Sequence, residues 1–140
     1  MKRRTALKLS LLALVTSVAS AYDSTKIANT LKMKKKDPKN PTKGELKHTP
    51  EIKVGEVDAN GYVTVDVNVG QEGILHPSTA DHWIYKIALY ANGTKVAHAD
   101  LEPVISRGYL SAKVKKEGLT ELKAIAWCNL HGEWENTVKV

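Results

Sequence analysis

The sequence predicts an all-β fold, an immunoglobulin-like antiparallel β-sandwich, because short alternating segments recur between frequent turns. The segment "YVTVDVNVG" places a valine at every second position from Val63 to Val69, so one face of this strand is apolar. The segment "HWIYKIALYA" is longer and more apolar, which is typical of a central strand. No segment after residue 47 shows the 3.6-residue periodicity of a long amphipathic helix.

Turn signals separate the other predicted strands. Asn92-Gly93 is a favoured two-residue hairpin turn, and it joins "HWIYKIALYA" to "KVAHADLEP". The segment "YLSAKVKK" alternates again, "LTELKAIAW" runs into Cys128, and "ENTVKV" supplies a last strand. About seven short strands result. A chain of 140 residues suits one domain of this kind, which we assign to residues 48–140.

The first 21 residues have the pattern of an export signal peptide. A basic "MKRRTALK" precedes an apolar "LSLLALVTSVA", and "ASA" fits a cleavage site of small residues. The pair Arg3-Arg4 is similar to a twin-arginine signal, although Ala6 stands at the usual aromatic position. A general secretory signal is the alternative. We therefore expect an exported, periplasmic protein without a stable membrane span after cleavage.

Removal of this signal changes the net charge. The whole chain has 21 Lys and Arg against 15 Asp and Glu, and four basic residues but no acid lie in the signal, so 17 against 15 leaves a net charge of +2. The basic isoelectric point therefore gives no reason to expect nucleic-acid binding. Residues 22–47 include "KMKKKDPKNPTKGELK", which is rich in lysine and lacks apolar periodicity. This composition predicts a basic, flexible arm.

The chain contains one cysteine, Cys128, which cannot form an internal disulfide. It must therefore be buried, reactive, bonded to another molecule or bound to a metal. A Cys-x-x-His sequence places the thiolate of Cys128 and the imidazole of His131 on one turn, and a His-x5-His sequence adds His76 and His82. A thiolate with several imidazoles suits zinc, copper or iron.

The available ligand types favour these three metals to different degrees. Structural zinc sites often use several cysteines, and only one is present. Blue-copper sites combine one thiolate and two imidazoles, usually with a methionine soon after the Cys-His turn. The methionines of this chain are Met1 and Met33, so copper is disfavoured. Four nitrogens and one sulfur would instead form a non-haem iron site with an open sixth position.

Three motifs together resemble the iron-binding domain of the superoxide reductases, the neelaredoxin and desulfoferrodoxin group. These motifs are "KHTPEI", "HPSTADHWI" and "CNLHGEWEN", and the resemblance extends from about Glu45 to the C-terminus. It implies the one-iron form, in which one iron ion (Fe²⁺/Fe³⁺) is held by four equatorial histidines and an axial thiolate. The implied metal ligands are His48, His76, His82, Cys128 and His131. The single cysteine leaves no four-cysteine, rubredoxin-like iron site in this chain.

The same resemblance implies an enzyme that reduces superoxide by one electron to hydrogen peroxide at the open axial position. An external electron donor, rubredoxin-like or a cytochrome, would then reduce the iron again, and a homo-oligomer is compatible with the sequence. Lys47 matches the family lysine that attracts superoxide. Glu45 is the candidate for the family glutamate that occupies the sixth position after oxidation. Leu46 separates Glu45 from Lys47 here, which departs from the family pattern.

Two other classes of function remain open at this point. One is a non-catalytic iron or copper electron-transfer protein that uses the same ligands, and the other is a binding module on the same fold. Metal analysis separates the binding module from the other two, because it need not hold iron. Superoxide consumption by the reduced protein separates the enzyme from the electron carrier.

Overall fold

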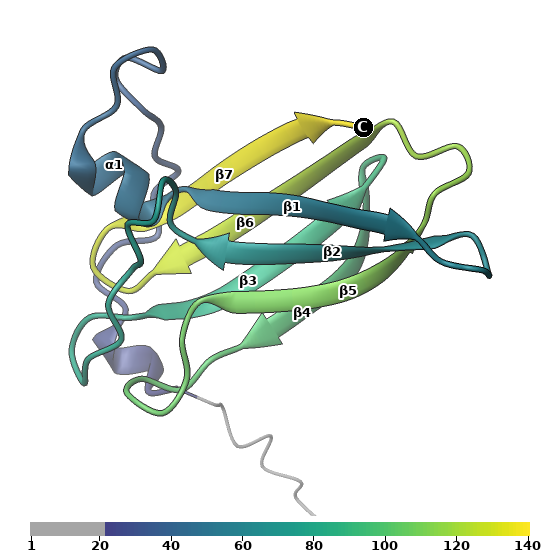
Figure 1. The fold of residues 1–140 in the computed structure, drawn as a ribbon. Coiled ribbons are helices and arrows are strands. Elements are labelled where there is room, and N and C mark those ends of the chain that lie inside the picture. The colour runs from purple at the N-terminus through teal and green to yellow at the C-terminus, as the bar shows by residue number, and fades with distance from the viewer. Residues whose placement is uncertain (1–21) are drawn as a thin grey trace, which may run out of the picture.

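The computed structural model describes residues 22–140, and the predicted export signal at residues 1–21 lies outside the described residues. Seven strands in the described part form two antiparallel sheets, as Figure 1 shows. The smaller sheet has the order β1-β2-β5, with β1 at Pro50–Val57, β2 at Tyr62–Val69 and β5 at Tyr109–Lys115. The larger has the order β4-β3-β6-β7, with β3 at Ile84–Ala91, β4 at Thr94–Asp100, β6 at Glu121–Cys128 and β7 at Gly132–Lys139. The predicted all-β sandwich is confirmed.

The core lies between the two sheets. The alternating valines of β2, from Val63 to Val69, are at most 2% exposed and face into the sandwich. From the larger sheet they meet the buried side chains of Ile87, Leu89 and Leu122, among others. Alternation at period 2 explains this arrangement, because every second side chain of a strand points to the same face.

The predicted hairpin between β3 and β4 is present. Asn92 and Gly93 form the two-residue turn with positive φ angles of 47° and 82°. The Asn92 side chain also accepts hydrogen bonds from the backbone N–H groups of Thr120 and Glu121, at 2.9 and 3.1 Å. The turn residue thus ties this hairpin to the start of β6.

The segment of residues 22–47 is not the flexible arm that its composition predicts. A 3-10 helix occupies Ser24–Lys26, and an α-helix, α1, occupies Lys43–His48. Between them, Lys32 forms a parallel bridge with Glu133 of β7, through 2.8 Å hydrogen bonds from Met33 N–H to Glu133 O and from Glu133 N–H to Leu31 O. Backbone pairing with a distant strand supplies this order, which a pattern of side chains along the segment cannot reveal.

Helix α1 is short, and its position depends on local contacts. Thr42 and Glu45 form a capping box at its start, in which each side chain accepts a hydrogen bond from the backbone of the other. At its end, the carbonyl oxygens of Leu46 and Lys47 approach Gly70 so closely that a Cβ there would collide with both. No helix among residues 22–140 is long and apolar enough to cross a membrane.

Candidate metal centre

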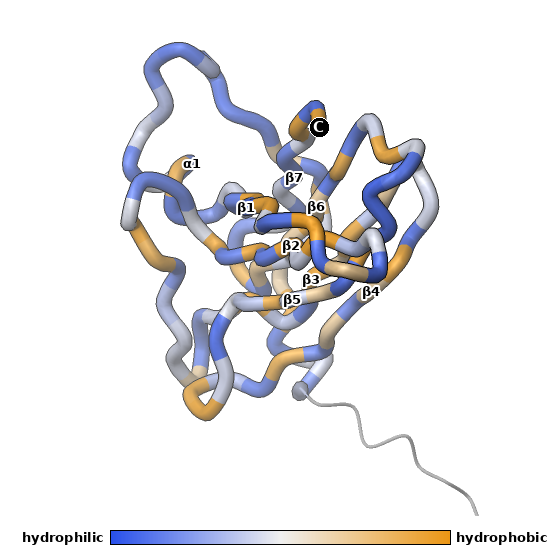
Figure 2. The backbone as a smooth tube through the Cα atoms, turned by 45° about the vertical axis from the view of Figure 1, so that its right-hand side comes forward, coloured by the Kyte–Doolittle hydropathy of each residue, from blue (hydrophilic) through white to orange (hydrophobic). Residues whose placement is uncertain are grey.

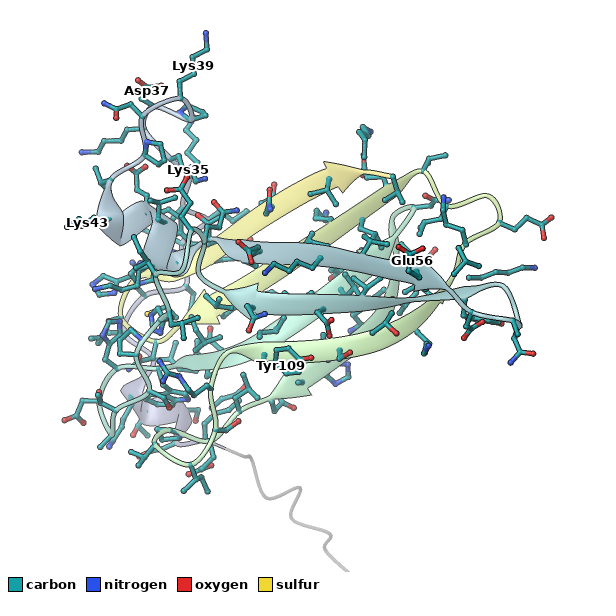
Figure 3. All side chains as sticks on the ribbon, viewed as in Figure 1. Lys35, Asp37, Lys39, Lys43, Glu56 and Tyr109 are labelled. Atoms are coloured by element: carbon teal, nitrogen blue, oxygen red, sulfur yellow. The ribbon has the colours of Figure 1, made fainter. Side chains whose placement is uncertain are left out.

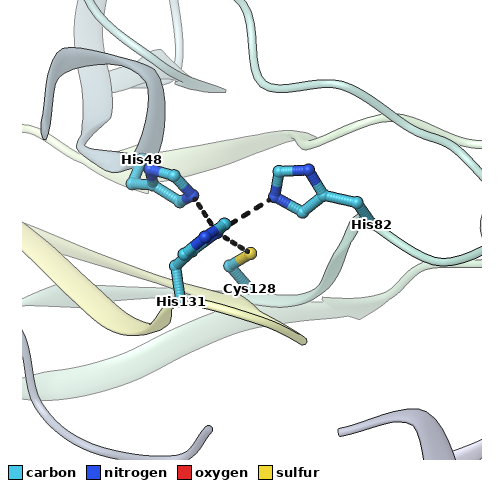
Figure 4. Close-up of side chains that lie close together, drawn as sticks. All are labelled: His48, His82, Cys128 and His131. Carbon is cyan, nitrogen blue, oxygen red and sulfur yellow. Dashed lines mark hydrogen bonds between the residues drawn. The ribbon is translucent and has the colours of Figure 1, made fainter. Parts of the chain in front are cut away.

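Three segments that are distant in the sequence meet at one end of the sandwich, at the left of Figure 1. Helix α1 supplies His48, the loop before β3 supplies His82, and the end of β6 with the turn that follows it supplies Cys128 and His131. Figure 4 shows these four side chains, and one donor atom from each lies within 4.8 Å of the others. The structure therefore brings four of the five predicted ligands into one group of metal-binding size.

The fifth predicted ligand, His76, adjoins this group. Its ring centroid lies 4.7 Å from that of His48 and 4.6 Å from that of His82. Its Nδ1 donates a 2.7 Å hydrogen bond to the carbonyl oxygen of Pro77, so its Nε2 carries the free lone pair. This Nε2 is the one buried side-chain nitrogen or oxygen among the described residues that has no hydrogen-bond partner. A buried acceptor without a hydrogen-bond partner is suited to ligating a metal ion.

The capped helix sets the tautomer of His48. Its Nδ1 lies 2.6 Å from the carbonyl oxygen of Gly44, one helical turn earlier, and donates to it. The other nitrogen, Nε2, then has a lone pair that faces the ring of His131. Histidine ligands of metals commonly donate their second nitrogen to a carbonyl in this way, which fixes the ring orientation.

The turn from Cys128 to Gly132 presents the sulfur and one imidazole together. The Cys128 Sγ accepts hydrogen bonds from the backbone N–H groups of Leu130 and His131. Gly132 has a φ of 84°, and a Cβ at this position would collide with the carbonyl oxygen of Leu31. Glycine is thus needed both for the turn and for the approach of the N-terminal segment.

Three nitrogen and sulfur atoms of the cluster gather around one nitrogen of His131. His131 Nδ1 lies 3.1 Å from His48 Nε2, 3.2 Å from His82 Nε2 and 3.6 Å from Cys128 Sγ, and these are the dashed lines that meet in Figure 4. His131 Nδ1 can carry at most one hydrogen, so it cannot donate to all three neighbours at once. A cation resolves this arrangement, and a set of four imidazoles and one thiolate suits iron.

Burial keeps these side chains in or near the states that a metal needs. It lowers the pKa of His48 to about 4 and that of His76 to about 3, so both rings are neutral at pH 7. Burial also raises the pKa of the Cys128 thiol, while the two backbone N–H groups partly oppose this effect. A bound cation would supply the charge that holds this sulfur as a thiolate.

An open cavity of about 350 Å³ gives access to the cluster. Lys47 lines it together with His48, His82 and His131, and the Lys47 side chain is half-buried. Burial is the largest cause of the lowered pKa of His82, and the charges of His131 and Lys47 lower this pKa further. The charge of Lys47 therefore acts on the His82 ring. Lys47 therefore lies beside the predicted centre.

Glu45 also borders this cavity, but its carboxylate is engaged elsewhere. One oxygen accepts a 2.7 Å hydrogen bond from Lys36 N–H and the other a 3.1 Å bond from Thr42 N–H. These bonds lower the pKa of Glu45. The capping sequence "TKGE" at residues 42–45 could have indicated this role, because Thr-x-x-Glu is the signature of a capping box.

Sequence reasoning did not reveal the long-range contacts of two residues at this end, Asn129 and Met33. Asn129 is 1% exposed; its Oδ1 accepts from Trp83 N–H at 2.9 Å, and its Nδ2 donates to the carbonyl oxygens of Asp81 and Lys26 at 2.8 and 3.2 Å. Met33, which the sequence places in the arm, lines the cavity. These contacts join distant parts of the chain, so no local pattern reports them.

The desulfoferrodoxin family model matches residues 40–137. Over 120 aligned residues the chain is 36% identical to the superoxide reductase of Pyrococcus furiosus, with 69% of this chain and 89% of that protein covered.

Solved structures agree with this match. The one-iron superoxide reductase of Giardia intestinalis superposes with a TM-score of 0.58 at 29% identity, covering 67% of this chain and 98% of that one. The superoxide reductase (neelaredoxin) of Archaeoglobus fulgidus gives a TM-score of 0.59 at 27% identity, covering 72% and 94%. The family match, the solved structures and the cluster of His48, His82, Cys128 and His131 together show that this chain belongs to the desulfoferrodoxin family of superoxide reductases, in the one-iron form.

Proposed function

We propose that this protein is a superoxide reductase, an oxidoreductase that adds one electron and two protons to superoxide and releases hydrogen peroxide. The observation that carries the proposal is the convergence of His48, His82, Cys128 and His131 beside an open cavity, in a chain of this family. The unpartnered Nε2 of His76 completes a set of five ligands. One bound iron ion supplies the electron.

The histidines act by holding their positions. His48 and His76 each donate from Nδ1 to a backbone carbonyl, which directs both Nε2 lone pairs to the centre. Both rings stay neutral at pH 7 because burial disfavours the imidazolium. This arrangement is prepared before the substrate arrives, so little reorganisation is needed during the reaction.

Lys47 acts on the substrate. Its ammonium borders the cavity that leads to the cluster, where a positive charge attracts the superoxide anion and orders the water that delivers protons. The carboxylate of Glu45 holds the N–H groups of Lys36 and Thr42, so we assign Glu45 to positioning α1 rather than to binding the metal.

Export and re-reduction complete the proposal. Residues 1–21 have the composition of a twin-arginine-like signal, so we infer that the protein acts in the periplasm. The reaction consumes an electron at each turn, so an external donor must restore it.

The product yield tests the proposed reaction. The iron-loaded, fully reduced protein is mixed with a pulse of superoxide, and hydrogen peroxide and oxygen are both measured. We expect one hydrogen peroxide for each superoxide consumed and no oxygen. Release of one oxygen for every two superoxides would indicate dismutation instead. No faster loss of superoxide than in buffer would indicate an electron carrier or a binding module.

A further inference from the structure

We propose that residues 31–43, here called the basic segment, form the docking surface for an acidic electron-donor protein, and that Trp134 connects this surface to the metal centre. The inference rests on the proposed function and names the kind of partner that supplies its electron. Four features carry it: the charge of the segment, its fixed position, the groove that it lines and the stacking of Trp134.

The basic segment concentrates the positive charge of the described chain. It holds six lysines and one acid, Asp37, for a net charge of +5. The rest of residues 22–140 holds 11 basic and 14 acidic residues, for a net charge of −3. Figure 3 shows Lys35, Lys39 and Lys43 around the loop that projects beside α1, and Figure 2 colours this loop as hydrophilic almost throughout.

These charges are held in place rather than spread over a mobile chain. Residues 31–33 pair with Glu133 of β7, Lys35 Nζ donates a 2.8 Å hydrogen bond to Gln71 Oε1, and Lys36 N–H donates to Glu45. The desulfoferrodoxin match begins at residue 40, so most of the basic segment lies outside the region matched by the family model. The fixed charge next to the metal end is thus a feature of this chain in its own right.

A groove of about 370 Å³ runs between the basic segment and β7. The residues that line it include Lys34, Lys35, Pro38 and Trp134. The exposed Glu135 is the acidic residue of this lining. The basic segment taken together with Glu133 and Glu135 of β7 has a net charge of +3. A partner with surface carboxylates complements this face, whereas a basic partner would be repelled.

Trp134 lies between the groove and the metal end. It lines both the groove and the cavity beside the cluster, and it is 7% exposed. Its ring stacks on His48, with centroids 5.4 Å apart and planes tilted by 25°. Electron tunnelling weakens steeply with distance, so an aromatic ring that spans from the docking groove to a predicted ligand offers a short route inward.

The expected complex is transient. Encounters between redox proteins commonly bury less than about 1,200 Å² and depend on electrostatic steering, which speeds association by about 10- to 1,000-fold. A rigid basic face around a small groove matches that kind of contact. A stable, largely apolar interface would require a larger and less charged surface.

Charge reversal tests the docking surface. The variant K34E/K39E changes two exposed lysines of the basic segment, and K95E/K116E changes two lysines at the opposite end of the sandwich. The probe is a reduced rubredoxin of net negative charge, mixed with the iron-loaded, oxidised protein in a stopped-flow instrument. We expect K34E/K39E to lower the second-order reduction rate about tenfold at low salt, with the difference vanishing at high salt. Equal effects of the two variants, or no effect of either, would overturn the proposal.

A small reductant provides the matched control. Hexaammineruthenium(II) is a cation that needs no protein docking, so K34E/K39E should not slow its reaction. If both reductants slow equally, the variant has damaged the centre and a docking role is rejected. Superoxide reduction is measured separately on protein reduced beforehand, without any donor. Failure there would reject the proposed function, while the rubredoxin rates would still report on docking.

Substitutions of Trp134 test the connecting ring. At saturating rubredoxin, Trp134→Leu should lower the limiting reduction rate, while Trp134→Phe, which keeps an aromatic ring, should retain most of it. The limiting rate of each variant is divided by its own hexaammineruthenium(II) rate, so that a change in the centre itself cancels, and iron content and the optical spectrum check the centre. Trp134→Met serves as a second ring-free variant if the leucine protein binds too little iron. An unchanged limiting rate in an iron-replete ring-free variant would overturn the role of Trp134.

Discussion

The interior of the sandwich and its metal end both contain fully buried side chains, but the chemistry of these side chains differs. Between the sheets, Val65, Val67 and Leu122 are fully buried in the apolar core, which stabilises the fold by about 25 cal/mol for each Å² of apolar surface removed from water. At the metal end, His48, His76 and Asn129 are buried although they are polar, and His76 Nε2 has no hydrogen-bond partner. The packing of the sandwich therefore involves only the chain's own side chains, whereas the metal end requires a bound cation to satisfy its ligand atoms.

The largest expected effect comes from Cys128→Ser, which separates the two regions. Loss of the thiolate should remove thiolate-to-iron absorption and lower superoxide reduction by more than about 100-fold, since changes outside the ligand set alone cost 10- to 100-fold. The sandwich should still unfold cooperatively, because Cys128 is one small member of its core. Iron analysis, visible spectra and thermal unfolding measure this. An unchanged spectrum would exclude Cys128 as a ligand.

Asn129→Ala should affect the metal end more than the interior. It leaves the buried N–H of Trp83 without an acceptor and removes two further hydrogen bonds to Asp81 and Lys26, at a cost of about 3 kcal/mol. Chemical denaturation gives this value, and iron content should fall with it. Asn129→Asp retains the acceptor but places a buried carboxylate oxygen against the carbonyl oxygens of Asp81 and Lys26, so it should lose at least as much stability as Asn129→Ala. A smaller loss in Asn129→Asp would show that the two hydrogen bonds donated by Nδ2 contribute little.

Val65→Ala is the matching change in the interior. Val65 is 0% exposed, so removal of two methyl groups and the cavity left behind should lower the free energy of unfolding by about 2 kcal/mol. Iron content and superoxide reduction should remain at the wild-type level. A loss of iron in this variant would mean that the two regions are not independent.

Acidification should distinguish the regions in the metal-free protein. The folded-state pKa values of His48 and His76, about 4 and about 3, lie below the unfolded value of about 6.5. The unfolded chain therefore binds more protons below pH 6.5, and stability is lost as the pH falls from 6.5 towards 4. Denaturation midpoints across this range measure the effect. A His76→Gln variant should show a smaller slope, and an identical slope would assign the loss to other groups.

Lys47→Ala should produce the smallest change. Loss of one ammonium beside the cavity should slow superoxide capture by about tenfold at most and weaken its dependence on salt, while iron content stays intact. Pulse radiolysis at several ionic strengths provides the rates. Lys95→Ala, at the far end, is the control and should match the wild type. A wild-type salt dependence in Lys47→Ala would reject the steering role.

The interior was more predictable from sequence than the metal end. The valine alternation of β2 and the Asn92-Gly93 turn express their structure within a few residues, so the sandwich could be read directly. The ligands were recognised through short motifs, but the geometry that joins them depends on Gly70 and Asn129, whose partners lie far along the chain. The order of residues 22–47 escaped prediction for the same reason, because it comes from backbone pairing with β7.

The span between the ligands has a consequence for how the protein matures. His48 and His131 are 83 residues apart, and Cys128 ends a strand that must pair in register with both β3 and β7. A slip of one residue in β6 would turn the sulfur to the opposite face of the sheet. Metal binding therefore requires the native strand register, because a chain with one misaligned strand cannot bring all five ligand side chains together. The intensity of the iron absorption in a fresh preparation would then measure the fraction of correctly folded molecules.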